Sequence, residues 1–147
     1  MSKIIFQAPP PRASAHEIAL FSANVINQIN QRLEEVRLRL RETQPVKVGS
    51  VTLGLYACGR GCLTCPHLKW SIWWAHRTVK ANLFRAHPIQ APLRRLHSTG
   101  DFAAGAAETR RLVEEAQRLF KVRSELAKGI GIMRRALIRA ADQSEEG

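Results

Sequence analysis

The chain has 147 residues, the usual length of a single domain, and 45% of them are hydrophobic, which excludes wholesale disorder. It contains no run of about 18 apolar residues, the length of a membrane-spanning helix, and its N-terminus shows no secretory signal. The 23 Lys and Arg residues against 12 Asp and Glu give a net charge of +11, which favours an anionic partner. The odd number of three cysteines argues against a disulfide framework. We therefore expect a small, basic, soluble protein of the cytoplasm that has no membrane partner.

The positive charge is concentrated in the middle of the chain. Residues 43–100 carry eight basic residues and no Asp or Glu, whereas residues 1–42 carry six basic and four acidic residues, and residues 101–147 nine and eight. The middle stretch also contains all three cysteines, all three tryptophans and four of the five histidines. This distribution predicts one domain in which two nearly neutral flanks surround a Cys- and Trp-rich segment, the basic module (residues 43–100).

The first flank is predicted to be an extended leader over residues 1–13 followed by a helix over residues 14–42. Ser14 and Glu17 have the spacing of a capping box, which satisfies free backbone N–H groups at the start of a helix. Apolar residues then recur at alternating steps of three and four, as on one face of a helix: Ile26, Ile29, Leu33, Val36 and Leu40. Gln44 precedes Pro45, and a residue before proline disfavours helical backbone, so the helix should end there.

In the basic module the apolar spacing changes to two. Val51, Leu53 and Leu55 occupy every second position, which predicts a short strand leading into the cysteines. Residues 71–77 and 82–85 fit the two arms of a hairpin. The apolar positions between 72 and 86 suit a helix as well, so the sequence leaves the choice between hairpin and helix open for residues 71–87.

The second flank, residues 101–147, is predicted to be a long helix over residues 102–140 with a frayed tail. Its apolar stripe is interrupted by Arg123 and consists of Leu112, Ala116, Leu119, Leu126, Ile130, Met133, Leu137 and Ala140. Gly129 and Gly131 each disfavour a helix by roughly 1 kcal/mol relative to alanine, so we expect a kink or break near them. The expected fold class is α+β and mostly α, with two long amphipathic, coiled-coil-like helices flanking a small β/zinc-knuckle module. The helices could pack on each other or on a second copy, as a homodimer.

The cysteines have the spacing of a metal site. Cys58, Cys62 and Cys65 follow the pattern C-x3-C-x2-C, and His67 lies two residues further on. Three cysteines and one histidine are a standard set of ligands for a structural, tetrahedral zinc ion. The sequence therefore predicts Zn²⁺ as a structural cofactor, with Gly59 and Gly61 allowing sharp turns between the ligands. His76 and His87 are alternative fourth ligands, and three reduced thiols without metal are the alternative to a metal site.

The same spacing occurs in a second class of protein, the radical S-adenosylmethionine enzymes, where it holds a four-iron cluster. Those enzymes need a full or partial α/β barrel of roughly 200 residues, whereas this chain predicts long helices and one small strand region. The basic module also lacks a carboxylate for general acid or base catalysis. A cysteine nucleophile beside His67, or an open catalytic zinc, is therefore the weaker alternative, and we expect that the chain is not an enzyme.

Nucleic-acid binding is the function that the basic module predicts. Unopposed cations can neutralise phosphates, and aromatic residues between them can stack on bases or insert at a deformed step. The predicted binding residues, for DNA more than for RNA, are Arg60, Lys69, Trp70, Trp73, Arg77, Lys80, Arg85, Arg94 and Arg95. The alternative function is a protein–protein interaction module, an inhibitor or adaptor that docks on an acidic protein surface.

Residues 49–74 also resemble a known family on their cysteine motif. The matching residues are Cys58, Gly59, Cys62, Cys65, Pro66 and His67. They resemble the core of a family of small bacterial and archaeal proteins, often encoded on mobile elements, whose motif reads roughly C-G-K-x-C-x-x-C-P-H-G-P-Y. Arg60 stands at the lysine of that motif, and residues 68–70 replace its last three residues. The resemblance implies a strand before the motif, a strand pair after it and helices at both ends. It also implies an accessory or regulatory DNA-binding protein of a mobile genetic element, such as a plasmid or conjugative-transfer factor.

Overall fold

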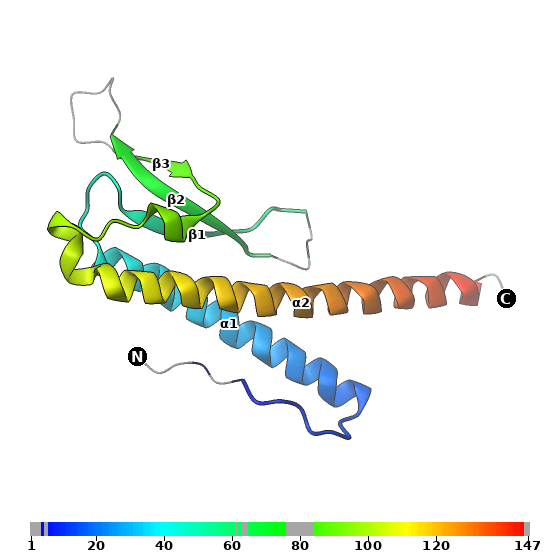
Figure 1. The fold of residues 1–147 in the computed structure, drawn as a ribbon. Coiled ribbons are helices and arrows are strands. Elements are labelled where there is room, and N and C mark those ends of the chain that lie inside the picture. Colours follow the sequence, from blue (N-terminus) through cyan, green and yellow to red (C-terminus); the bar gives the residue numbers. More distant parts are fainter. Residues whose placement is uncertain (1–3, 5, 61, 63–64, 76–83, 146–147) are drawn as a thin grey trace.

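The structure consists of two long helices and a small sheet (Figure 1). It is a computed structural model that describes residues 4, 6–60, 62, 65–75 and 84–145. Its elements in chain order are α1 (Ala15–Thr43), β1 (Val51–Tyr56), β2 (His67–Ala75), β3 (Phe84–Pro88), the 3-10 helices η1 (Pro92–Arg95) and η2 (Gly100–Gly105), and α2 (Ala106–Glu145). The helices run antiparallel, and the sheet lies over the end where α1 finishes and α2 begins. This mostly helical architecture confirms the predicted α+β fold class.

Helix α1 begins and ends at the predicted signals. The Glu17 backbone N–H donates to Ser14 Oγ at 3.2 Å, which caps the first turn. Gln44 has extended backbone (φ −125°, ψ 148°) before Pro45, and the helix ends. The Gln44 side chain then pairs with the backbone of β1, since its amide donates to the Val51 carbonyl at 2.8 Å and accepts from the Val51 N–H at 2.9 Å. The end of α1 is therefore tied directly to the sheet.

The strands form one antiparallel sheet in the order β1-β2-β3. In the register, Val51 lies opposite Ile72, Leu53 opposite Trp70, and Ile72 in turn opposite His87. Residues 71–75 and 84–88 are thus two paired strands, which decides the open choice in favour of the hairpin arms over a helix. Residues 76–83 lie outside the described part of the chain.

The hydrophobic core lies between the two helices and the facing side of the sheet. Its fully buried members come from one face of α1, from β1 and from the first half of α2: Ile29, Leu33, Val36, Leu40, Leu53, Leu112, Val113, Ala116 and Leu119. Burying one such Leu or Ile side chain stabilises the fold by about 1.5–3 kcal/mol. The predicted stripes therefore form the core, apart from Ile26 on α1 and the second half of the α2 stripe.

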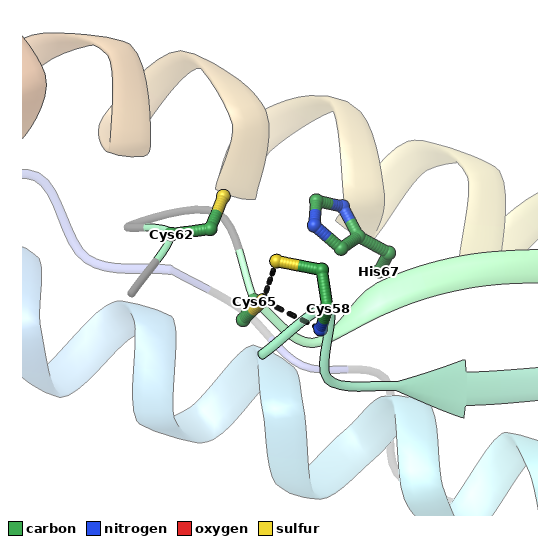
Figure 2. A group of neighbouring side chains, drawn as sticks. All are labelled: Cys58, Cys62, Cys65 and His67. Atoms are coloured by element: carbon green, nitrogen blue, oxygen red, sulfur yellow. Dashed lines mark hydrogen bonds between the residues drawn. The ribbon is translucent and has the colours of Figure 1, made fainter. Parts of the chain in front are cut away.

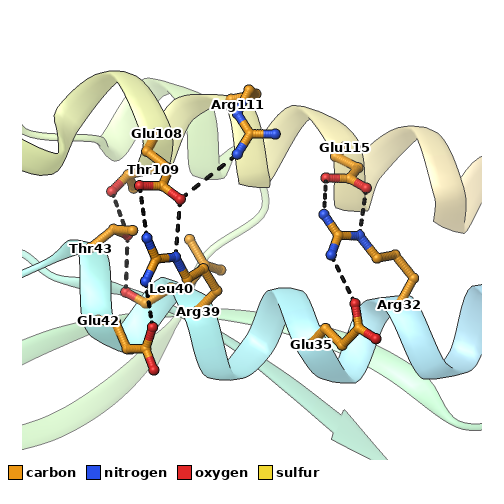
Figure 3. A network of polar contacts seen from close by, with 10 residues as sticks. All are labelled: Arg32, Glu35, Arg39, Leu40, Glu42, Thr43, Glu108, Thr109, Arg111 and Glu115. Carbon is orange, nitrogen blue, oxygen red and sulfur yellow. Dashed lines mark hydrogen bonds and ion pairs between the residues drawn. The ribbon is translucent and has the colours of Figure 1, made fainter. Parts of the chain in front are cut away.

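Ion pairs join α1 to the first turns of α2 (Figure 3). The guanidinium of Arg32 donates to both carboxylate oxygens of Glu115 at 2.7 and 3.0 Å, and both side chains are more than nine-tenths buried. Arg39 makes the same forked contact with Glu108 at 3.0 and 3.3 Å. Because forked contacts require a fixed relative orientation, these pairs define how α1 lies against α2.

The end of α1 lies very close to the residue that precedes α2. A Cβ atom added at Gly105 would lie 1.8 Å from the carbonyl oxygen of Thr43, so only glycine fits. Thr109 Oγ1 donates to Thr43 Oγ1 at 2.9 Å one turn later. Residues 100–105 form the 3-10 helix η2, so α2 starts at residue 106 and not at 102 as predicted.

The second half of α2 extends beyond the core. The predicted break near Gly129 and Gly131 is wrong, because α2 is one helix from Ala106 to Glu145, and the predicted frayed tail is helical as far as Glu145. Large apolar side chains on this half are exposed: Ile132, Met133, Leu137 and Ile138. Among the described residues, no helix is apolar enough over a sufficient length to cross a membrane.

Candidate metal centre

The loop between β1 and β2 brings the four predicted ligands together (Figure 2). One ligand atom each from Cys58, Cys62, Cys65 and His67 lies within 4.8 Å of all the others, and the Sγ atoms of Cys58 and Cys65 are 3.3 Å apart. Around a tetrahedral zinc ion with bonds of about 2.3 Å, the sulfur atoms lie about 3.8 Å apart. The group therefore needs only small movements of its side chains to hold one metal ion.

The sheet holds the two ends of this loop. Tyr56, the last residue of β1, lies opposite His67, the first residue of β2, and their rings are 5.5 Å apart. Cys58 follows two residues after β1. Gly59 has φ +70°, a conformation that other residues rarely adopt, and it turns the chain back after the first cysteine, as the sequence predicts. Gly61 lies outside the described residues.

The local contacts favour a thiolate at Cys58. A backbone hydrogen bond from Arg60, with contacts from Cys65 and His67, lowers the Cys58 pKa to about 6. At Cys65, a hydrogen bond from the Cys58 backbone N–H favours the thiolate and lowers the pKa. The hydrogen bond with the Cys58 sulfur, burial and the negative charges of the neighbouring cysteines together outweigh this effect, so the Cys65 pKa is raised. Contact with the sulfur of Cys58 also raises the pKa of His67. Since metal ions bind thiolates, one ligand is already close to its binding form at neutral pH.

The four side chains suit a tetrahedral metal ion. All four are half-buried, and Cys58, Cys62 and His67 line a shallow cleft together with Tyr56 and Arg60. Four protein ligands fill the coordination of a tetrahedral ion and leave no position for a substrate. The alternative ligand His87 lies elsewhere, with its ring edge-on to Trp74 at 6.1 Å, and the other alternative, His76, is outside the described residues.

The cations predicted to bind nucleic acid are exposed but do not share one face. Lys69 alternates with the core residue Trp70 along β2, so it projects from the side of the sheet away from the helices. Arg85 lies opposite Trp74 and therefore projects from the helix side. The remaining described cations are Arg60, beside the metal ligands, and Arg94 and Arg95, on η1. Arg77 and Lys80 lie outside the described residues.

Two tryptophans that were predicted to bind nucleic acid, Trp70 and Trp73, pack partly against other parts of the protein. Trp70 packs against the hydrophobic core. Trp73 is half-buried and lines a pocket together with residues at the end of α1. Trp74, which was not among the predicted binding residues, is 50% exposed. Which tryptophan is accessible depends on the strand register, a pairing that the local sequence does not reveal.

One buried side chain beside the centre was not predicted as part of it. Arg123 on α2 is 2% exposed, and the charges of Cys62 and Cys65 act on it. Its only signal in the sequence is that it interrupts an apolar stripe.

Comparisons with protein-family models, with curated proteins and with solved structures find no match to this chain. The fold and the ligand group define a small α+β protein with a site that can hold a metal ion.

Proposed function

We propose that this chain is a nucleic-acid-binding protein, acting on DNA more than RNA, whose basic module is stabilised by a structural zinc ion. The observation that carries the proposal is the contrast between two sets of cations. Three of the four arginines of α1 are paired with carboxylates, namely Arg32, Arg37 and Arg39. In the described part of the basic module, by contrast, five exposed cations have no carboxylate within 4 Å: Arg60, Lys69, Arg85, Arg94 and Arg95.

Unpaired, exposed cations are suited to phosphates. No ion pair has to be broken before they bind, and each phosphate that they neutralise releases a counterion into solution. Lys47 is the contrasting case in the module, since its ammonium group already contacts Asp101 at 2.9 Å. Trp74 is half exposed and lies opposite Arg85 on the neighbouring strand, where an indole ring is accessible for stacking on an unpaired base.

Zinc is the metal that the ligands favour. Thiolates are soft ligands that prefer zinc over magnesium or calcium, and a fully ligated site is structural. Three thiolates and a neutral imidazole around Zn²⁺ leave a net charge of −1. The ion would fix the loop that carries Arg60 and the start of the strand that carries Lys69.

A binding titration tests the function. The purified chain is titrated with duplex DNA, single-stranded DNA and RNA at about 50 and 200 mM salt, a range over which phosphate-dominated binding weakens steeply. The variant Arg94→Glu/Arg95→Glu should bind more weakly, and its salt slope should fall by up to about 1.8 if both side chains contact duplex phosphates. Arg134→Glu/Arg135→Glu on the end of α2 is the matched control, since it makes the same change of charge at two exposed, adjacent arginines.

The outcomes separate the alternatives. Equal weakening by both double variants would mean that net charge alone attracts the nucleic acid. No binding to any of the three at about 100 mM salt would refute nucleic-acid binding and favour the alternative, an inhibitor or adaptor on an acidic protein surface.

The setting and the assembly are further parts of the proposal. The motif resemblance supports a mobile genetic element, with the chain as an accessory or regulatory factor of plasmid or conjugative transfer. This setting predicts tighter binding to DNA from the chain's own genetic neighbourhood than to unrelated DNA of equal length. A homodimer through the long helices is supported by the exposed apolar side chains on the end of α2, such as Leu137 and Ile138.

A further inference from the structure

Arg123 carries a buried charge that nothing in the helices balances. Its side chain is 2% exposed in the middle of α2, between Leu119 and Ala127 on the same face. The Nε atom is buried and has no hydrogen-bond partner. No carboxylate among the described residues lies within 4 Å of its nitrogen atoms, and Glu115, the buried acid of α2, is paired with Arg32. An isolated buried charge is strongly destabilising, so a negative partner is expected.

The groups near it that are negatively charged when they bind metal are the cysteine ligands. Figures 1 and 2 both show α2 running alongside the loop between β1 and β2. Burial lowers the pKa of Arg123, and the charges of Cys65 and Cys62 act against that lowering. Val122, the preceding residue, packs against the core, so α2 is held firmly at this point.

We propose that Arg123 is the charge partner of the metal centre, a buried guanidinium that offsets the net negative charge of three thiolates and one imidazole around zinc. The inference rests on the proposed zinc site. Arg123 does not bind the metal and acts through the cysteine ligands. Zn²⁺ binds all three cysteines as thiolates, so the full negative charge lies near Arg123 only when the metal is bound. In the metal-free protein the buried guanidinium is less well compensated, and this residue is destabilising. With metal, the charge is balanced, and Arg123 strengthens binding.

The test measures zinc affinity and stability together. Arg123→Met removes the charge and keeps much of the length, Arg123→Lys keeps the charge, and Arg118→Met is the control at an exposed arginine of the same helix. Zn²⁺ affinity is measured by competition with a chromophoric chelator, and urea unfolding is followed with zinc and with excess chelator. We expect Arg123→Met to bind zinc roughly 10- to 100-fold more weakly, the usual cost of losing a partner of the ligands. Its metal-free form should be at least as stable as the metal-free wild type.

A spectroscopic readout separates this role from a merely structural one. In the Co²⁺-loaded protein, the thiolate-to-cobalt charge-transfer band should move to lower energy in Arg123→Met, because the sulfur electrons lose a stabilising positive charge. Arg123→Lys should restore the band and most of the affinity, and Arg118→Met should change neither.

The failures are distinguishable. If the wild-type chain binds neither Zn²⁺ nor Co²⁺, the proposed metal site is wrong. If it binds them and Arg123→Met has the wild-type affinity or an unshifted band, the metal site stands and the role of Arg123 is wrong.

Discussion

Replacing Gly105 by alanine tests the close contact between the two helices. The added Cβ would lie 1.8 Å from the Thr43 carbonyl oxygen and 2.9 Å from its carbonyl carbon. Ordinary carbon–oxygen contacts need more than 3 Å, so the end of α1 and the start of α2 must separate by more than an ångström. The clash is with backbone, which no side-chain rotation can relieve.

The expected loss combines overpacking with broken contacts. Overpacking alone costs about 1–3 kcal/mol. Separation would also stretch the Thr109–Thr43 hydrogen bond, which lies within the next turn, and a net hydrogen bond contributes about 1 kcal/mol. We expect Gly105→Ala to lower the free energy of unfolding by about 3 kcal/mol. At about 2–4 °C per kcal/mol for a chain of this size, Tm should fall by about 10 °C.

Thermal and urea unfolding followed by circular dichroism measure this change. Gly129→Ala is the matched control, because a Cβ at this exposed helical glycine meets no other atom within 4 Å. Alanine there should stabilise the helix by about 0.5–1 kcal/mol. A Gly105→Ala protein with wild-type stability would show that α1 and α2 do not meet as described.

Three further predictions concern the metal, the buried ion pair and the assembly. Native mass spectrometry should find one zinc ion per wild-type chain and none in Cys62→Ser. If the wild-type protein folds without metal and its Tm does not rise when zinc is added, the structural role of the metal is wrong. Glu115→Leu should cost up to about 3–5 kcal/mol, because Arg32 loses its buried carboxylate and keeps only the exposed Glu35. Adding Arg32→Met should recover most of that loss in urea unfolding, and equal stability of the single and double variants would argue against a buried pair. Leu137→Glu should convert a dimer to a monomer in sedimentation equilibrium, and a monomeric wild type would refute the dimer.

Structural features that depend on residues close together in the chain could be predicted from the sequence. The capping pair Ser14 and Glu17 and the Gln44–Pro45 stop signal act within one turn of helix, so they identify the limits of α1. The metal ligands lie within ten residues, between two strands that hold the ends of their loop. In each case the chain itself limits how far apart the residues can be.

Features that depend on long-range packing could not be predicted. Two glycines cost α2 roughly 2 kcal/mol in local propensity, yet the helix continues, because intrinsic propensity is a weak determinant over a long helix. Trp70 was expected at nucleic acid and packs against the core, since the pairing of Leu53 with Trp70 decides its face. The charges of Cys62 and Cys65 act on Arg123 only in the folded chain, so the sequence shows this residue as an interruption of an apolar stripe and nothing more.

The contact between Gln44 and Val51 has a consequence for association between molecules. β1 is an outer strand, and outer strands expose backbone groups that can recruit a strand from another molecule, a common start of aggregation. At Val51 both outward-facing backbone groups are occupied by one amide side chain from the end of α1. Gln44 thus blocks the start of this sheet edge against pairing with a strand from another molecule. An apolar residue at the same position would leave these two backbone groups unpaired.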